Sequence, residues 1–110
     1  MPTQQARSRK RQILTEIARL DFCLPGRLVQ RTTRCGKANC GCHDDPARRH
    51  GPYPTGIRKV GDKTITRTLS ESQAERYRPW FDNTRRLRQL VSELETLSAG
   101  AATTAEGWAA

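Results

Sequence analysis

Three cysteines lie within eight residues, at Cys35, Cys40 and Cys42, and a histidine follows at His50. Structural zinc sites are built from four such thiolate and imidazole ligands arranged as a tetrahedron. The polar first ten residues lack the apolar run of a secretory signal, so we expect a reducing cytoplasm in which thiols stay free. The spacing therefore predicts a Zn²⁺ site rather than a disulfide framework.

The fourth ligand has two candidates. His43 directly follows Cys42, and neighbouring residues seldom both direct ligands to one tetrahedral ion. His50 opens a His-Gly-Pro-Tyr turn that can bring its imidazole back to the thiolates. We favour His50 and keep His43 as the alternative. Cys23, in an apolar setting, is interpreted as a small core residue.

Catalysis would require an open position on the metal and a general base beside it. The acids nearest the cysteines are Asp44 and Asp45, in a polar segment typical of a solvated turn. The sequence contains neither a glycine-rich phosphate loop nor a zinc-deaminase motif. We predict a protein that is not an enzyme; a metal hydrolase or a thiol redox sensor is the alternative.

The chain is short and poor in core residues. Of 110 residues only 35% are hydrophobic, and the mean hydropathy is −0.80. Such chains usually gain stability from a metal, a partner or a long helical interface. No stretch has the roughly 20 apolar residues that span a bilayer, so we expect no membrane partner.

The formal charge is +9, from 20 basic and 11 acidic residues. A positive field attracts polyanions, chiefly nucleic acid, although an arginine-rich composition alone gives the same total. We expect nucleic acid as partner, DNA ahead of RNA, although the residues themselves do not separate the two. The predicted contacts are Arg7, Arg9, Lys10, Arg11, Arg27, Arg31, Arg34, Arg48, Arg49, Arg58 and Lys59.

Periodicity places these residues on elements. Apolar residues at helical spacing predict a helix over 12–20, and β-compatible residues predict a strand from Leu28 toward Cys35. Two further strands, 55–60 and 63–69, flank Gly61-Asp62, a glycine-first pair that favours a type II′ turn.

A long helical segment follows. Ser70 or Ser72 can open it with a capping box, and Pro79 predicts a break into two helices. Leucine spacing then predicts an apolar seam for a helical hairpin or a dimer, formed by Leu87, Leu90, Val91, Leu94 and Leu97.

Together these elements predict an α+β fold: an N-terminal helix, a small antiparallel sheet of about three strands with a zinc-binding loop, and a long C-terminal helix. We expect a disordered basic arm over 1–11, one zinc-stabilised domain over 12–98 and a flexible tail over 99–110.

Several motifs carry a resemblance to a known family: Arg34-Cys35-Gly36-Lys37, Asn39-Cys40-Gly41-Cys42 and His50-Gly51-Pro52-Tyr53. The chain resembles, over about residues 12–97, an uncharacterised family of small prokaryotic proteins found near, or labelled as, transposase-related genes. The resemblance implies the ligand role for the same three cysteines and His50, and it implies an association with mobile elements.

Two functions follow as hypotheses. The first is a non-enzymatic, zinc-stabilised nucleic-acid-binding or accessory protein, associated with mobile-element machinery. The second is a protein-interaction module or subunit that docks through its leucine-lined helix, on itself as a homodimer or in a larger assembly.

Overall fold

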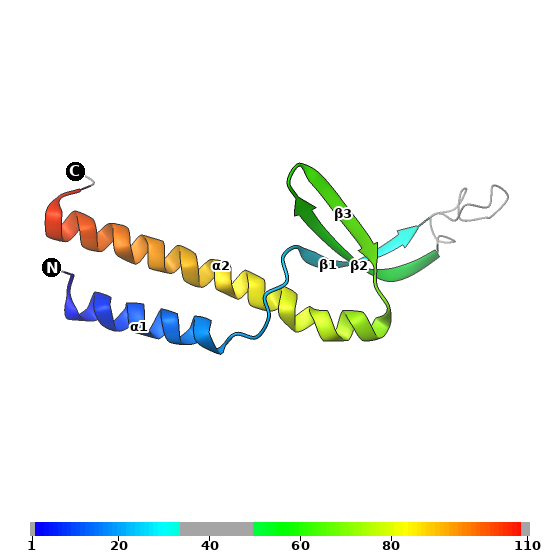
Figure 1. Cartoon of the computed structure of the whole chain (residues 1–110), viewed down its shortest axis with the longest axis horizontal. Helices are drawn as coiled ribbons and strands as arrows, with labels where there is room; N and C mark the ends of the chain where they lie inside the picture. The colour runs from blue at the N-terminus through cyan, green and yellow to red at the C-terminus, as the bar shows by residue number, and fades with distance from the viewer. Residues whose placement is uncertain (1, 34–49, 109–110) are drawn as a thin grey trace. The chain divides into compact units, whose positions relative to one another are not determined.

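The computed structural model describes residues 2–33 and 50–108, shown in colour in Figure 1. Along the chain come helix α1 (Gln4–Arg19), strands β1 (Arg27–Thr33), β2 (His50–Val60) and β3 (Lys63–Thr68), and helix α2 (Glu71–Glu106). This is the predicted α+β fold. The chain divides into two compact units, which we call the helix pair (1–23 with 82–110) and the sheet unit (24–81).

The three strands form one antiparallel sheet in the order β1-β2-β3. Val60 pairs with Lys63 across the two-residue turn, in which Gly61 has φ +61° and Asp62 does not have a positive φ. This combination fits the predicted type II′ turn, which requires a positive φ only at its first central residue. Gly26 precedes β1 with φ +102°, and a Cβ there would collide with the carbonyl oxygen of Ile57. Glycine is therefore required where the chain enters the sheet.

The sheet packs on the first turns of α2. Ser70 opens this helix: its Oγ accepts from the backbone N–H of Gln73 at 3.1 Å, and the Gln73 side chain accepts from the Ser70 N–H at 2.9 Å. The capping box therefore forms at Ser70 and not at Ser72. Phe81 is buried, and a Cβ added at Gly56 would lie 3.7 Å from its ring. A strand residue without a side chain thus lets the helix approach.

The helix pair consists of α1 and the later part of α2, which run side by side (Figure 1). Ile13 and Leu90, both 0% exposed, are the largest fully buried side chains. Two ion pairs join the helices, with Arg9 Nε 2.8 Å from a Glu93 oxygen and Arg86 Nε 3.2 Å from a Glu16 oxygen. Seven residues separate the two pairs on each helix, so the helices keep one antiparallel register.

The predicted disordered arm is wrong for residues 4–11, which form the first half of α1. Thr3 caps this helix by accepting from the Ala6 N–H at 3.0 Å. Arg9, expected to be a free arm residue, hydrogen-bonds to Glu93, 84 residues further along the chain. The arm is ordered by a distant segment, which the local sequence does not reveal.

Two further expectations are corrected in α2. The helix is continuous from Glu71 to Glu106 with Pro79 inside it, instead of breaking there. It also continues through the first eight residues of the predicted tail, because alanine is the strongest helix former. It ends where Gly107 adopts φ +65°, the usual left-handed helix stop. Among the described helices, none is long and apolar enough to cross a membrane.

Candidate nucleic-acid interface and metal segment

Most of the predicted metal ligands belong to residues 34–49, which connect β1 to β2 in the sequence. Cys35, Cys40, Cys42 and the alternative ligand His43 lie outside the described residues. His50 begins β2, and its backbone pairs with that of Thr33 at the end of β1. The ladder therefore brings together the two chain ends that flank residues 34–49.

Within ranges 2–33 and 50–108, no group of three or more metal-ligating side chains occurs. Cys23, which is described, is half-buried, and its thiol donates to the Asp21 carbonyl at 3.6 Å. Cys23 belongs to the helix pair.

The strands carry a one-sided composition of charge. They contain no acidic residue and six basic ones: Arg27, Arg31, Arg58, Lys59, Lys63 and Arg67. None of the six forms an ion pair with any acidic residue in the described part of the chain. No carboxylate within 2–33 and 50–108 neutralises their positive charge, and such a charge attracts anions.

Strand register distributes these six residues between the two faces of the sheet. Side chains alternate along a strand, and directly paired residues share a face. Arg27 pairs with Ile57, and Arg31 with Tyr53, so both arginines share a face with Lys59. Threonines from β3 lie on the same face, since Thr64 pairs with Lys59. This set, Arg27, Arg31, Lys59, Tyr53 and Thr64, is exposed, and we call it the basic face.

Arg58 and Arg67 belong to the opposite face, where Arg67 pairs with Gly56. They border a groove of about 360 Å³ beside the aromatic residues at the start of α2. The Tyr77 and Trp80 rings stack there with their centroids 5.3 Å apart. Arg58 and Lys59, adjacent in sequence, thus cannot contact one surface together, although both were predicted as nucleic-acid contacts.

Arg67 and Lys63 were not predicted as contacts. Period-two alternation in 63–69 was visible in the sequence, and it places Lys63, Ile65 and Arg67 on one face. The signal that identifies them is this alternation together with the absence of acidic residues from 63–69.

The four predicted contacts that lie in α1 do not form one cluster. Arg9 is committed to Glu93, and this hydrogen bond, with the charge of Arg9, lowers the pKa of the Glu93 carboxyl. Arg7 and Lys10 border a groove between the two helices, and Arg11 lies on the outer surface of α1 with Gln12 and Thr15. The remaining predicted contacts, Arg34, Arg48 and Arg49, lie outside the described residues.

The predicted leucine seam is largely internal. Leu90 is fully buried, and Leu87, Leu94 and Leu97 are half-buried. Val91 remains 41% exposed. The helices therefore pair within one chain, one of the two arrangements that the spacing predicted.

Residues 3–79 match the model of a protein family described as Domain of unknown function (DUF6788). The chain belongs to this family. The matched range includes α1, all three strands and α2 as far as Pro79, so it contains the basic face and the cysteine segment. For DUF6788 the description states no activity. No curated protein and no solved structure matches the chain.

Proposed function

We propose that this protein is a non-enzymatic, zinc-stabilised nucleic-acid-binding or accessory protein, with DNA as its main partner. The observation that carries the proposal is the composition of the strands, which have six basic residues and no acidic one. A surface of arginine and lysine with no acidic partner among the described residues gains affinity by displacing counterions from phosphates. Threonine hydroxyls and Tyr53 on the basic face add hydrogen-bond donors for the same groups.

Zinc enters the proposal through the chemistry of the donors. Three thiolates and one imidazole complete a tetrahedral structural set, so no position remains for a reacting water. The β1–β2 pairing supports this set, because Cys35 lies two residues beyond Thr33, the partner of His50.

The cellular setting is part of the proposal. Free thiols fit a cytoplasmic protein, and the resemblance of the Cys-Gly-Lys and His-Gly-Pro-Tyr motifs favours a role with mobile-element machinery. Neither follows from the geometry, and both depend on the cysteine motif.

The direct test is a titration of the full-length, metal-loaded protein with labelled duplex DNA, single-stranded DNA and RNA, followed by fluorescence anisotropy. We expect the logarithm of the affinity to fall linearly with the logarithm of the salt concentration, with a slope near −0.9 per phosphate contacted on duplex DNA. Negligible binding to all three at roughly 50 mM salt would falsify the proposal.

The metal has its own test, which is elemental analysis of the purified protein. We expect one zinc per chain, lost in Cys40→Ser and in His50→Gln but retained in His43→Gln. The two histidine substitutions are matched controls, since each removes one imidazole from the same segment.

A further inference from the structure

The two long sides of the helix pair differ in character. The ion pairs Arg9–Glu93 and Glu16–Arg86 lie along one side. Gln12 adds to it by accepting from Arg9 at 3.2 Å. This side is closed by its own polar contacts.

The other side is apolar and open. Two right-handed helices that run in opposite directions rotate in opposite senses when viewed from one end. The residue after each buried seam residue, about 100° further round, therefore turns to the same side of the pair. Leu14 follows Ile13, and Val91 follows Leu90. These two are 48% and 41% exposed, so large apolar side chains from both helices face solvent on one side.

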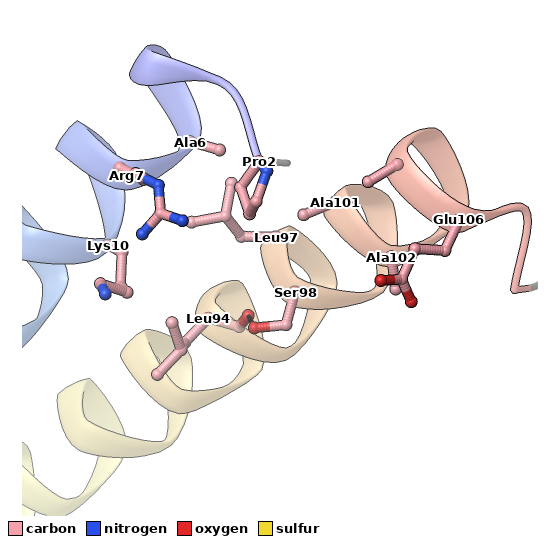
Figure 2. A pocket seen from close by; sticks show the side chains of 11 residues that line it. Pro2, Ala6, Arg7, Lys10, Leu94, Leu97, Ser98, Ala101, Ala102 and Glu106 are labelled. Carbon is pink, nitrogen blue, oxygen red and sulfur yellow. Dashed lines mark hydrogen bonds between the residues drawn. The ribbon is translucent and has the colours of Figure 1, made fainter.

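A groove of about 410 Å³ continues this side toward the C-terminal end of α2 (Figure 2). Ser98 lies seven residues after Val91, two helical turns along the same stripe. The lining is mostly apolar and small, with Arg7 and Lys10 of α1 on the rim; its α2 residues include Leu94, Leu97, Ala101, Ala102 and Ala105. We call Leu14, Val91 and this groove the open side.

The chain carries complementary charges on the two flanks of the open side. On α1 the flank is basic, since Arg7 lies seven residues before Leu14. On α2 it is acidic, since Glu95 lies one turn after Val91. No ion pair within the described ranges uses Arg7 or Glu95. Arg9 and Glu93 are in contact, so they lie at the same level along the helix pair. Because the helices are antiparallel, two residues before Arg9 and two residues after Glu93 again lie at one level, and these residues are Arg7 and Glu95.

We propose that a second copy of this chain packs on the open side. The two-fold axis runs parallel to the helices, so α1 of one copy covers α2 of its partner. Rotation about this axis leaves the position of each residue along the helices unchanged. Leu14 then meets the partner's apolar stripe, and Arg7 meets the partner's Glu95, twice per dimer. The other two-fold, perpendicular to the helices, would set α1 on α1 and so oppose the basic flank of one copy to the basic flank of the other.

Burial supports the same conclusion. Among the described residues of the helix pair, only Ile13 and Leu90 are large, fully enclosed side chains. Two helices with so small a core are marginal in water unless a further apolar surface covers them. A four-helix arrangement of two pairs buries Leu14 and Val91 and closes the groove.

Sedimentation of the full-length protein, freed of nucleic acid in high salt and returned to low salt, tests the proposal. We expect a dimer at about 50 µM and a more than tenfold weaker association in Leu14→Asp, which buries a charge at the contact. Arg7→Glu and Glu95→Arg should each weaken association about threefold to tenfold, since each disrupts two exposed pairs.

The double variant Arg7→Glu with Glu95→Arg restores both pairs across the dimer, so it should recover the association that each single change loses. Arg11→Glu, on the outer surface of α1, is the matched control and should associate like the original protein. A monomer at about 50 µM, or a double variant no better than the single ones, would overturn the proposal. Circular dichroism confirms that the variants remain helical.

Discussion

The helix pair and the sheet unit differ in whether their basic residues form ion pairs. In the helix pair, Arg9 and Arg86 bond to carboxylates on the opposite helix, and Arg85 pairs with Asp82 on its own helix. In the strands, six basic residues have no acidic partner among the described residues. Similar side chains thus hold two helices together in one unit and leave a positive surface in the other.

The two units also differ in the buried side chains that stabilise them. The helix pair encloses Ile13 and Leu90 completely, whereas the buried residues of the sheet unit include Ala74, Phe81 and Thr55, two of them small. A three-stranded sheet with so few large buried side chains among its described residues gains most from a cross-link where β1 ends and β2 begins. The predicted zinc segment lies at that point, after Thr33 and before His50.

Removing zinc should therefore destabilise the sheet unit more than the helix pair. Chelation, or Cys35→Ser, is expected to open the β1–β2 ladder, because structural zinc contributes on the order of 10 kcal/mol to small folds. The helix pair should persist, because it encloses Ile13 and Leu90 without the metal. Hydrogen exchange followed by mass spectrometry measures both units in one sample. Equal protection in the strands with and without chelator would contradict the assignment of zinc as the support of the sheet.

Leu90→Ala should produce the reverse pattern. Truncating a fully buried leucine costs about 2–5 kcal/mol, and here the loss falls on the helix pair. Ser92→Ala, at an exposed position two residues further along α2, is the control and should cost less. Urea unfolding followed by helical circular dichroism gives both values. Equal costs for the two variants would show that Leu90 does not occupy the core.

Neutralising the basic face should weaken nucleic-acid binding more than neutralising the helices. We expect Arg27→Gln with Arg31→Gln and Lys59→Gln to reduce the salt slope by about three, one per lost phosphate contact. The control carries Arg85→Gln with Arg88→Gln on α2. If this control loses as much slope per residue removed, the strands are not the binding surface.

The smallest effect concerns the Arg9–Glu93 pair. The hydrogen bond from Arg9 lowers the pKa of Glu93 in the folded chain below its usual value. The pair therefore stabilises the fold at neutral pH, and this contribution is lost as the pH falls through the lowered pKa. NMR titration of the Glu93 carboxyl should show the lowered value, and Arg9→Gln should return it to the ordinary range. An unchanged titration in that variant would mean that Arg9 does not cause the shift.

Local signals predicted the elements well. Gly61-Asp62 set the hairpin turn, Ser70 and Gln73 set the start of α2, and period-two alternation set β3. Each of these depends on residues a few positions apart, which the sequence places in contact directly. Arg27 and Arg31 also share a face, which follows from alternation along one strand and needs no partner.

The errors have a different origin. The helical arm, the continuous passage through Pro79 and the helical tail depend on contacts or cumulative propensities beyond a local window. Arg9 could not be assigned to Glu93, since 84 residues separate them. The cysteine segment stays a prediction, since its ligands other than His50 lie outside the described residues.

The sequence by itself determined the order of the elements, the turn residues and the net charge of +9, because these follow from local backbone preference and composition. Only the tertiary structure decided which charges are neutralised and which leucines are enclosed. Those outcomes depend on distance in space between Arg9 and Glu93, or on the helix that covers Leu90, and distance in space is not a property of local sequence.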